Sequence, residues 1–508
     1  MFSTKCFVSV RHLMWAVLVF LAARSASGQR LVLAHYMVTN QDYQADTDPT
    51  QEAKIAAYER EIRQAQAIGI DGFALNVGGW RRETYYIRYS AQMFEAAARL
   101  NTGFKLVFSA DMCCGNTAGD VEDMMRRFAN NPRYSNVYLR YKNRPVLTTF
   151  SGDKFGTQFW QQIRNDLAKG ANPSLKEAAG VLPAAAGVPS NRRMKIFLVP
   201  GFFWGGDLPA LADVQKEFKK WRSAIDGAFY WGIAGVPSSG GPLDQLASSR
   251  AYADTLHGGG KLYMAPVCLQ FWGANANRYY EYSGAAGMRA MWMHAIRTTH
   301  PKWVEIITWN DFIEGTYVSP IDDPNRYPGA NFLNSTGVPL GTLGYFHSHS
   351  AATALIPYFI QWYKTGIEPR IPQDAVYYFY RTQTLADHPR TPSVAHQYGP
   401  VADMIYVTAN LTAAATLHVT SGGHTTAISL PAGSTDAMAP IFAGESPQLT
   451  LCRSDQVIFA KSASEPIPAR TKYNNFYYAT GTLSAHENLI SRLLSAGCPA
   501  PALPSPAP

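Results

Sequence analysis

The chain is poor in charge, and the charge it has is spread out. Only 16% of its 508 residues are Asp, Glu, Lys or Arg, and 45 basic residues against 37 acidic ones leave a formal charge of +8. No dense run of Lys and Arg interleaved with aromatic residues occurs, although a nucleic-acid surface needs one. The sequence therefore predicts no nucleic-acid partner.

Cysteine and histidine are also scarce, and neither is arranged as a metal site. The six cysteines and 12 histidines lack the short spacings of zinc-binding motifs. We expect no metal and no other cofactor. In an oxidising compartment Cys452 can pair with Cys498, whereas Cys113 and Cys114 form either a vicinal bridge or, as we prefer, two separate thiols.

A long apolar run occurs once, near the N-terminus. Residues 13–23 (LMWAVLVFLAA) follow Lys5 and Arg11 and precede small residues that end at Gly28. This order is typical of a secretory signal peptide, and the run is shorter than the roughly 20 residues of a spanning helix. We expect residues 1–28 to be removed and the protein to be secreted, free or associated with a cell wall. A retained signal anchor is the alternative.

Aromatic residues, by contrast, are plentiful, with 11 Trp, 28 Tyr and 25 Phe. Either they build a large aromatic core, or some of them stack on flat apolar faces such as those of sugar rings. Composition alone does not separate these two interpretations.

Short apolar runs recur along the first two thirds of the chain and alternate with helical segments. The runs are nearly continuous in apolar residues, as parallel strands buried on both faces should be. They lie at residues 31–38, 70–77, 104–111, 145–150, 195–201, 226–232, 261–267 and 304–310. Apolar residues at helical spacing follow each run, in segments 50–68, 86–100, 120–130, 155–168, 211–224, 244–256, 283–299 and 348–364. Eight such repeats predict an α/β fold, a closed (β/α)8 TIM barrel over residues 29–365, with a surface insertion at 170–194.

The pattern of apolar and polar residues changes after a linker at residues 366–373. Short runs with alternating apolar and polar residues follow, separated by Gly and Ser turns, which is the pattern of an antiparallel β-sandwich. The runs lie at residues 375–381, 404–409, 415–421, 425–430, 448–453 and 456–461, with a last strand expected within 474–483. We expect a sandwich over 374–497 that packs on the barrel, and a flexible Pro/Ala-rich tail over 498–508.

The eighth apolar run ends in ITWNDFIEGT (307–316), where Asp311 and Glu314 follow the strand directly. Active sites of such barrels gather at the carboxyl ends of the strands. Two carboxyl groups that face one site cannot both ionise easily, so one pKa should rise and that group can serve as an acid. One proton donor and one carboxylate is what cleavage of a glycosidic bond requires. The alternative is a helix cap with an exposed acidic partner.

Other polar and aromatic residues also stand at predicted strand ends. The candidate substrate-binding residues are His35, Tyr36, Asn76, Asp111, Trp204, Trp231, Trp272, Trp309 and Asn310. We expect the aromatic rings to stack on sugars, and His35, Asn76 and Asn310 to bond to hydroxyls. The alternatives are a core histidine at His35, a capping role for Asp111, and packing for Trp204, Trp231 and Trp272, of which at least one should line the cleft.

At these residues the sequence resembles glycoside hydrolase family 71, the secreted α-1,3-glucanases also called mutanases. The resemblance is carried in order by AHYMV (34–38), GIDGFALNVG (69–78), FSADM (108–112), FYWG (229–232), YMAPV (263–267), ITWNDFIEGTYVSP (307–320), ALIPYFIQWYK (354–364) and YYFYRT (377–382). It implies a (β/α)8 catalytic domain followed by a β-sandwich, and endo-type, inverting hydrolysis of α-1,3-glucan. It places the catalytic pair at Asp311, as general base, and Glu314, as general acid, although chemistry alone would accept the reverse.

The sequence departs from the family pattern near the expected cleft. Phe312 and Ile313 replace Tyr-Gly of a W-N-D-Y-G-E-S motif, and CLQFWGANAN (268–277) stands where a Ser-Pro-Trp-Phe-like segment is expected. The motif is also similar to that of the family 99 endo-acting α-mannosidases. The alternatives are therefore a glycosidase acting on another α-linked polysaccharide, such as a mannan, and a carbohydrate-binding protein without catalysis. In each case the expected partner is a polysaccharide, with no membrane partner after signal cleavage, and the protein is expected to be a monomer.

Overall fold

The computed structural model describes residues 30–39, 51–170, 192–233, 245–273, 278–321, 347–387, 401–471, 474–484 and 498. The predicted signal peptide, most of the predicted insertion and all of the predicted tail except Cys498 lie outside the described residues. Among the helices of the described ranges, none is long and apolar enough to cross a membrane.

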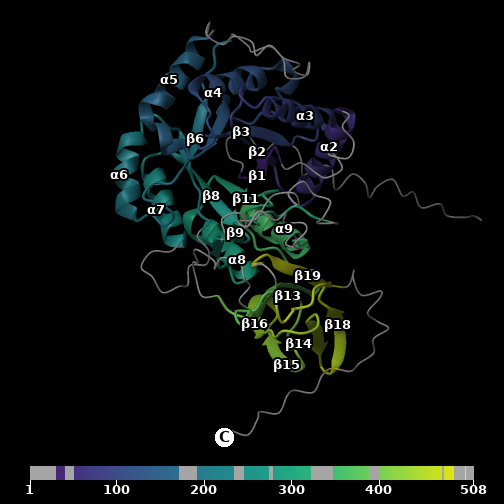
Figure 1. Cartoon of the computed structure of the whole chain (residues 1–508). Helices are drawn as coiled ribbons and strands as arrows, with labels where there is room; N and C mark the ends of the chain where they lie inside the picture. Colours follow the sequence, from purple (N-terminus) through teal and green to yellow (C-terminus); the bar gives the residue numbers. More distant parts are fainter. Residues whose placement is uncertain are drawn as a thin grey trace, which may run out of the picture.

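Eight parallel strands close into a barrel (Figure 1). They are β1 (Leu31–Met37), β2 (Gly72–Val77), β3 (Lys105–Asp111), β5 (Arg144–Phe150), β6 (Phe197–Phe202), β7 (Gly227–Tyr230), β8 (Leu262–Cys268) and β11 (Trp303–Ile307). The ring closes through parallel pairing of β3 with β5 and of β1 with β11. β4 (Arg140–Tyr141) adds a short antiparallel hairpin to β5. The predicted (β/α)8 barrel is confirmed.

Helices follow the strands and surround them. They are α2 (Gln51–Ala67), α3 (Tyr85–Leu100), α4 (Ala118–Met124), α5 (Gly156–Lys169), α6 (Leu211–Trp221), α7 (Gln245–Gly258), α8 (Ala285–His294) and α9 (Ser350–Thr365). π-helical turns, Met125–Ala129 and Ala295–Thr299, continue α4 and α8. Short 3-10 turns lie at Pro132–Tyr134 and Gly152–Phe155. One departure from the simple repeat is the antiparallel pair β9 (Phe271–Gly273) and β10 (Arg278–Tyr280), inserted between β8 and α8.

Local sequence explains these elements. In α2 the side chains of Ile55, Tyr58 and Ile62 recur at helical spacing and are all buried against the barrel. Burying such a side chain stabilises the fold by about 1.5–3 kcal/mol. Thr117 and Asp120 form a reciprocal capping box that starts α4. Position 72 must be glycine, because a Cβ there would lie 2.3 Å from the carbonyl oxygen of Lys105 on β3.

The C-terminal region forms two antiparallel four-stranded sheets. The first has the order β16 (Gly433–Pro440), β13 (Met404–Leu411), β12 (Ala375–Arg381) and β19 (Tyr478–Ser484). The second has the order β15 (His424–Leu430), β14 (Ala415–Ser421), β17 (Gln448–Arg453) and β18 (Gln456–Ser462). The predicted antiparallel sandwich is confirmed, whereas β16 was not predicted, because GSTDAMAP lacks the β-branched and aromatic alternation of a strand.

The central strand β12 of the first sheet is buried on both faces. On β12, Tyr378 and Tyr380 join the core between the two sheets, whereas Tyr377 and Phe379 belong to the same apolar cluster as the barrel. This follows from the two-residue alternation of side chains along a strand. The strands β12, β13 and β19 pack on α8 and α9, and Figure 1 shows the sandwich below the barrel at this side. The sandwich therefore packs on the barrel, as expected.

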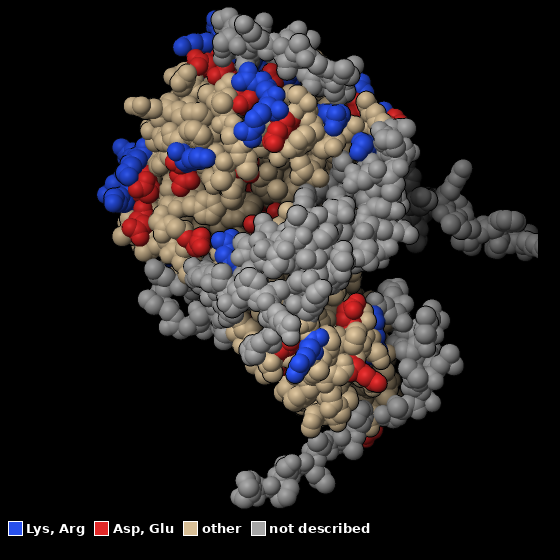
Figure 2. All heavy atoms as spheres, in the orientation of Figure 1, with Lys and Arg blue, Asp and Glu red and all other residues tan. Residues whose placement is uncertain are grey.

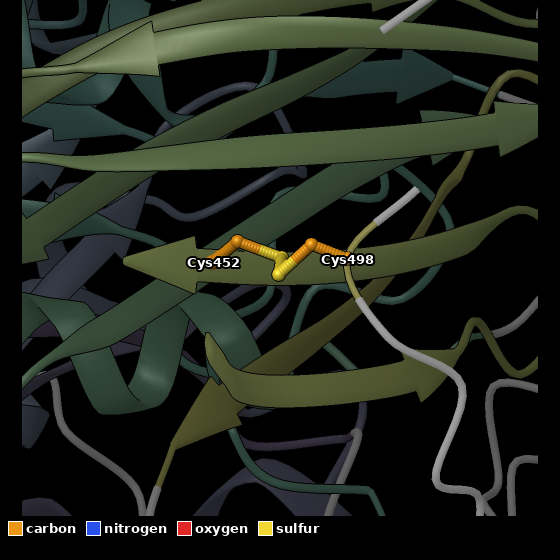
Figure 3. Close-up of a disulfide and its surroundings, with 2 residues drawn as sticks. All are labelled: Cys452 and Cys498. Atoms are coloured by element: carbon orange, nitrogen blue, oxygen red, sulfur yellow. A yellow bond between two sulfur atoms is a disulfide. The ribbon is translucent and has the colours of Figure 1, made fainter. Parts of the chain in front are cut away.

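A disulfide ties the end of the described chain to the sandwich. Cys452 of β17 is bonded to Cys498, 46 residues further on (Figure 3). Cys113 and Cys114 are both exposed free thiols, and Cys268 is a buried one. The predicted pairing and the preferred pair of separate thiols are both confirmed.

Candidate active site

A loop that follows β11 carries the two acidic residues. The Trp309 N–H donates to the carbonyl oxygen of His35 at 2.7 Å, and the Thr308 N–H donates to that of Thr316 at 2.9 Å. Asn310 holds the loop to β1 with its side-chain amide, which accepts from the Met37 N–H at 2.8 Å and donates to the Met37 carbonyl oxygen at 3.1 Å. The loop is therefore folded back on itself and fixed to the barrel end.

Asp311 and Glu314 are held by hydrogen bonds within this loop. The Asp311 N–H donates to Thr308 Oγ1 at 2.8 Å, and the Glu314 N–H donates to Asp311 Oδ1 at 3.1 Å. The Glu314 carbonyl oxygen accepts from the Trp272 N–H at 2.8 Å. Asp311 is 9% exposed and Glu314 is partly exposed. Both carboxyl groups thus lie at the carboxyl end of β11, where the sequence predicted them.

Burial raises the pKa of both carboxyl groups, and the charge of Asp311 raises that of Glu314 further. The pKa of Glu314 is raised to about 8, chiefly by burial and next by the charge of Asp311; Arg278 opposes this shift and Asp111 adds to it. Burial also raises the pKa of Asp311, against the N–H of Glu314 and the charge of His35. Glu314 is therefore suited to hold a proton, whereas the N–H of Glu314 and the neighbouring His35 limit the rise in the pKa of Asp311.

A buried histidine and glutamate pair lies beside Asp311. His35 Nδ1 and Glu305 Oε1 are 2.7 Å apart, and both side chains are nearly inaccessible. The His35 ring meets the Trp231 ring edge to face, with centroids 4.7 Å apart. Glu305 therefore orients the imidazole within the barrel mouth.

Aromatic rings line one wall next to this pair. Trp231 packs against Phe150 at 5.0 Å, and Phe150 packs against Phe203 at 5.4 Å between ring centroids. Phe150 and Phe203 are only partly buried. These residues come from the ends of neighbouring strands β5, β6 and β7, and their rings form a row that meets His35 at Trp231.

Asn76 and Asp111 complete the polar part of the mouth. Asn76 pairs with Met37 and Ser109 in the β1–β2–β3 register, on the same strand face as Asp111. Asp111 accepts from the Cys113 N–H at 2.9 Å, and its charge raises the pKa of Glu314. The structure thus brings together His35, Asn76, Asp111, Trp231, Asp311 and Glu314.

Four other candidates pack elsewhere. Tyr36 lies against Tyr58 and Phe73, because it faces opposite to His35 along β1. Trp204 stacks on Phe202 and Tyr252. The Trp309 indole N–H donates to Glu61 of α2 at 3.0 Å, and Trp272 packs on Phe476 of the C-terminal region. All four are at most 2% exposed, and these contacts direct their rings toward core side chains instead of the carboxyl pair.

Sequence reasoning missed three residues near the carboxyl pair. The sequence could have indicated Glu305, since it is a lone carboxylate inside an apolar strand. Arg278 begins β10, directly after the segment that departs from the family pattern, and its guanidinium packs over the Phe271 ring at 4.9 Å. Tyr477 had no signal, because its contact with the loop joins distant parts of the chain.

A cavity of about 430 Å3 lies at the opposite, amino-terminal end of the barrel. Its lining includes Arg30, Arg144, Lys261 and Lys302, and Asp226 is the one carboxylate among its described lining residues. Asp226 is already bonded to Arg144 at 2.9 Å. This cavity lacks a carboxyl pair and is not the candidate active site.

On the face drawn in Figure 2, most charged side chains lie around the edge of the barrel, and a few acidic atoms show in the hollow at its otherwise uncharged middle. Within the described ranges, no cluster of three or more His, Cys, Asp or Glu side chains is arranged to hold a metal ion. The groups gathered at the mouth are the carboxyl groups of Asp111, Asp311 and Glu314, the imidazole of His35, the amide of Asn76 and aromatic rings.

Comparison with known proteins places the chain in a family. The family model of glycosyl hydrolase family 71 matches residues 28–492. The chain is 27% identical to the glucan endo-1,3-alpha-glucosidase agn1 of Schizosaccharomyces pombe, over 93% of this chain and 100% of that protein. It is 27% identical to a mutanase of Penicillium rubens, over 80% and 79% of the two chains.

Among solved structures, the chain is similar to a family GH99 endo-alpha-mannosidase from a Bacteroides species. The TM-score is 0.44 and the identity 11%, over 65% of this chain and 97% of that one. This likeness is too distant to bear on function. The match to the family model spans most of the chain, and the chain therefore belongs to glycosyl hydrolase family 71 and is a glycoside hydrolase.

Proposed function

We propose that this glycoside hydrolase is a secreted enzyme that cleaves α-1,3-glucan within the chain and inverts the configuration at the anomeric carbon. The observation that carries the proposal is the carboxyl pair after β11, in which the pKa of Glu314 is raised to about 8. A group that stays protonated near neutral pH is a suitable general acid. The substrate is supported by the names of the relatives, two of which are endo-1,3-alpha-glucan hydrolases.

In the proposed reaction Glu314 is the general acid and Asp311 the general base. Glu314 donates its proton to the glycosidic oxygen as the bond from that oxygen to the anomeric carbon breaks. Asp311 takes a proton from a water molecule, whose oxygen bonds to the anomeric carbon from the opposite face. Proton exchange with solvent then returns both groups to their starting states. The raised pKa of Glu314 favours this assignment over the reverse one.

The remaining residues of the mouth are proposed to bind sugar. The partly exposed rings of Phe150 and Phe203, with Trp231 beside them, offer apolar surfaces on which sugar rings can stack. Asn76 and Asp111 are proposed to bond to sugar hydroxyls. The N-terminal apolar segment supports secretion, and one relative is named an ascus wall endo-1,3-alpha-glucanase, which supports action at a cell wall.

The test is product release from insoluble α-1,3-glucan by the wild type, Glu314→Gln and Asp311→Asn. We expect release by the wild type and at least a thousandfold loss of kcat in both variants, with unchanged binding to the polymer. The sugar released first should be the β-anomer by NMR. An α-anomer at early times would reject inversion.

The same panel should contain α-mannan. Release from α-mannan alone would agree with the proposed catalytic role of the carboxyl pair but would reject α-1,3-glucan as the substrate. Binding without release from any polymer would instead favour a carbohydrate-binding protein without catalysis.

A further inference from the structure

A short segment of the C-terminal region reaches the loop that carries the carboxyl pair. The Tyr477 hydroxyl donates to the carbonyl oxygen of Phe312 at 2.5 Å and lies 3.4 Å from that of Ile313. These two carbonyls are the backbone between Asp311 and Glu314. Tyr477 is fully buried, so this contact is shielded from water.

The ring of Tyr477 also packs on the loop just after Glu314. Gly315 has a φ of +65°, and a Cβ there would lie 2.7 Å from the Tyr477 ring and 2.9 Å from Gln270 Nε2. Only glycine allows so close an approach in this conformation. Tyr477 thus contacts the loop on both sides of the Glu314 backbone.

Tyr477 is itself held in place by its neighbours. Its N–H donates to Asn475 Oδ1 at 3.1 Å, and the Asn475 N–H donates to Gln383 Oε1 at 2.6 Å. The Tyr478 N–H donates to Gln270 Oε1 at 3.1 Å, which fixes the segment to the end of β8. These bonds give the hydroxyl a defined position from which to act on the loop.

We propose that Tyr477 is a positioning residue for catalysis: its hydroxyl fixes the backbone between Asp311 and Glu314, so that the sandwich is a required part of the active site. This inference rests on the proposed roles of those two carboxyl groups. Tyr477 does not touch the reacting atoms. It acts by holding the acid at the glycosidic oxygen while the base faces the attacking water, a geometry to which turnover is more sensitive than binding.

The test is the variant Tyr477→Phe, which keeps the ring and removes the hydroxyl. The matched control is Tyr380→Phe, because the buried Tyr380 hydroxyl also donates to a backbone carbonyl, that of Glu465 at 2.6 Å, within the sandwich. We expect Tyr477→Phe to lower kcat on α-1,3-glucan at least tenfold with KM changed less than twofold. Tyr380→Phe should keep wild-type kcat.

A second measurement does not depend on the substrate. Hydrogen–deuterium exchange in the peptide that covers residues 308–316 should become at least fivefold faster in Tyr477→Phe and stay unchanged in Tyr380→Phe. Asn475→Ala keeps the tyrosine but removes its backbone anchor, so it should change both readouts in the same direction by a smaller factor. If Tyr477→Phe does not fold, Asn475→Ala provides the test in its place.

The outcomes separate this inference from the proposed function. If the wild type cleaves the glucan, Glu314→Gln does not, and Tyr477→Phe matches Tyr380→Phe in kcat and exchange, only the role of Tyr477 is rejected. If Glu314→Gln keeps wild-type turnover, the proposed function is rejected. Faster exchange with unchanged kcat would show a purely structural contact and would also reject the role of Tyr477.

Discussion

Asp311 and Glu314 carry the same functional group three positions apart, yet their surroundings differ. Asp311 accepts a backbone N–H, and the neighbouring His35 opposes the rise in its pKa, whereas the negative charges of Asp311 and Asp111 raise the pKa of Glu314. The difference arises from side chains that converge from β1, β3 and the loop after β11. Residue identity alone therefore does not decide which carboxyl group holds the proton.

The raised pKa of Glu314 makes a prediction about stability. In the unfolded chain a glutamate ionises near pH 4.3, whereas Glu314 in the folded protein keeps its proton up to about pH 8. Between these values the folded state binds more protons, so this group's contribution to the free energy of unfolding falls as pH rises. Glutamine does not ionise, so Glu314→Gln lacks this loss. As the pH rises from 4.5 to 8, its free energy of unfolding should increase by about 1–3 kcal/mol relative to that of the wild type.

Urea unfolding at pH 4.5, 6 and 8 would measure this gain. Glu445→Gln is the control, because Glu445 is an exposed carboxylate of the sandwich. Its stability should follow that of the wild type at each pH. If Glu314→Gln also follows the wild type, the folded protein does not hold Glu314 protonated.

At the scale of elements, local sequence predicted the strands and helices well because burial on both faces leaves a continuous apolar run. The strand β16 was missed, since GSTDAMAP has the small and polar residues of a turn. Arg278 was missed because it lies in the inserted β9–β10 pair. The bond from Tyr477 to Phe312 spans 165 residues, and nothing in either segment indicates the other. Local patterns thus predict elements, whereas contacts between distant elements need the fold.

Within the loop after β11, the Thr308 hydroxyl holds the backbone of Asp311. Thr308 Oγ1 accepts from the Asp311 N–H at 2.8 Å and lies 2.9 Å from Thr316 Oγ1. Thr308→Val keeps the shape but leaves the buried Asp311 N–H without its acceptor. We expect a loss of about 1–3 kcal/mol in the free energy of unfolding and a kcat on α-1,3-glucan about tenfold lower.

Thr316→Val is the matched control for this loop. It removes the bond between the two hydroxyls but leaves the bond from the Asp311 N–H to Thr308. Its effects on stability and kcat, measured by urea unfolding and by glucan turnover, should be smaller. Equal effects in both variants would mean that the Thr308 hydroxyl has no special role in holding Asp311.

At the scale of the whole molecule, barrel and sandwich share a core. Tyr377, Phe379 and Tyr478 of the first sheet belong to the same apolar cluster as the barrel strands. A buried ion pair crosses the same interface, where Arg381 of β12 bonds to Glu281 after β10 at 2.6 Å. Glu281 also accepts from the Tyr478 hydroxyl at 2.7 Å. We therefore expect the two parts to unfold together.

The ion pair between Arg381 and Glu281 tests this coupling. Both side chains are at most 3% exposed, so Arg381→Met leaves an uncompensated buried carboxylate. Loss of one partner of a buried pair typically costs about 3–5 kcal/mol, and it should lower the melting temperature of the barrel and sandwich alike. Arg289→Met is the control, because its bond to Asp436 at 2.7 Å crosses the same interface but is more than a quarter exposed; such a pair is worth about 0–1 kcal/mol. The double variant Arg381→Met/Glu281→Gln should recover part of the lost free energy of unfolding, as measured by calorimetry. A melting curve of Arg381→Met in which the sandwich transition moves alone would mean that the two parts fold independently.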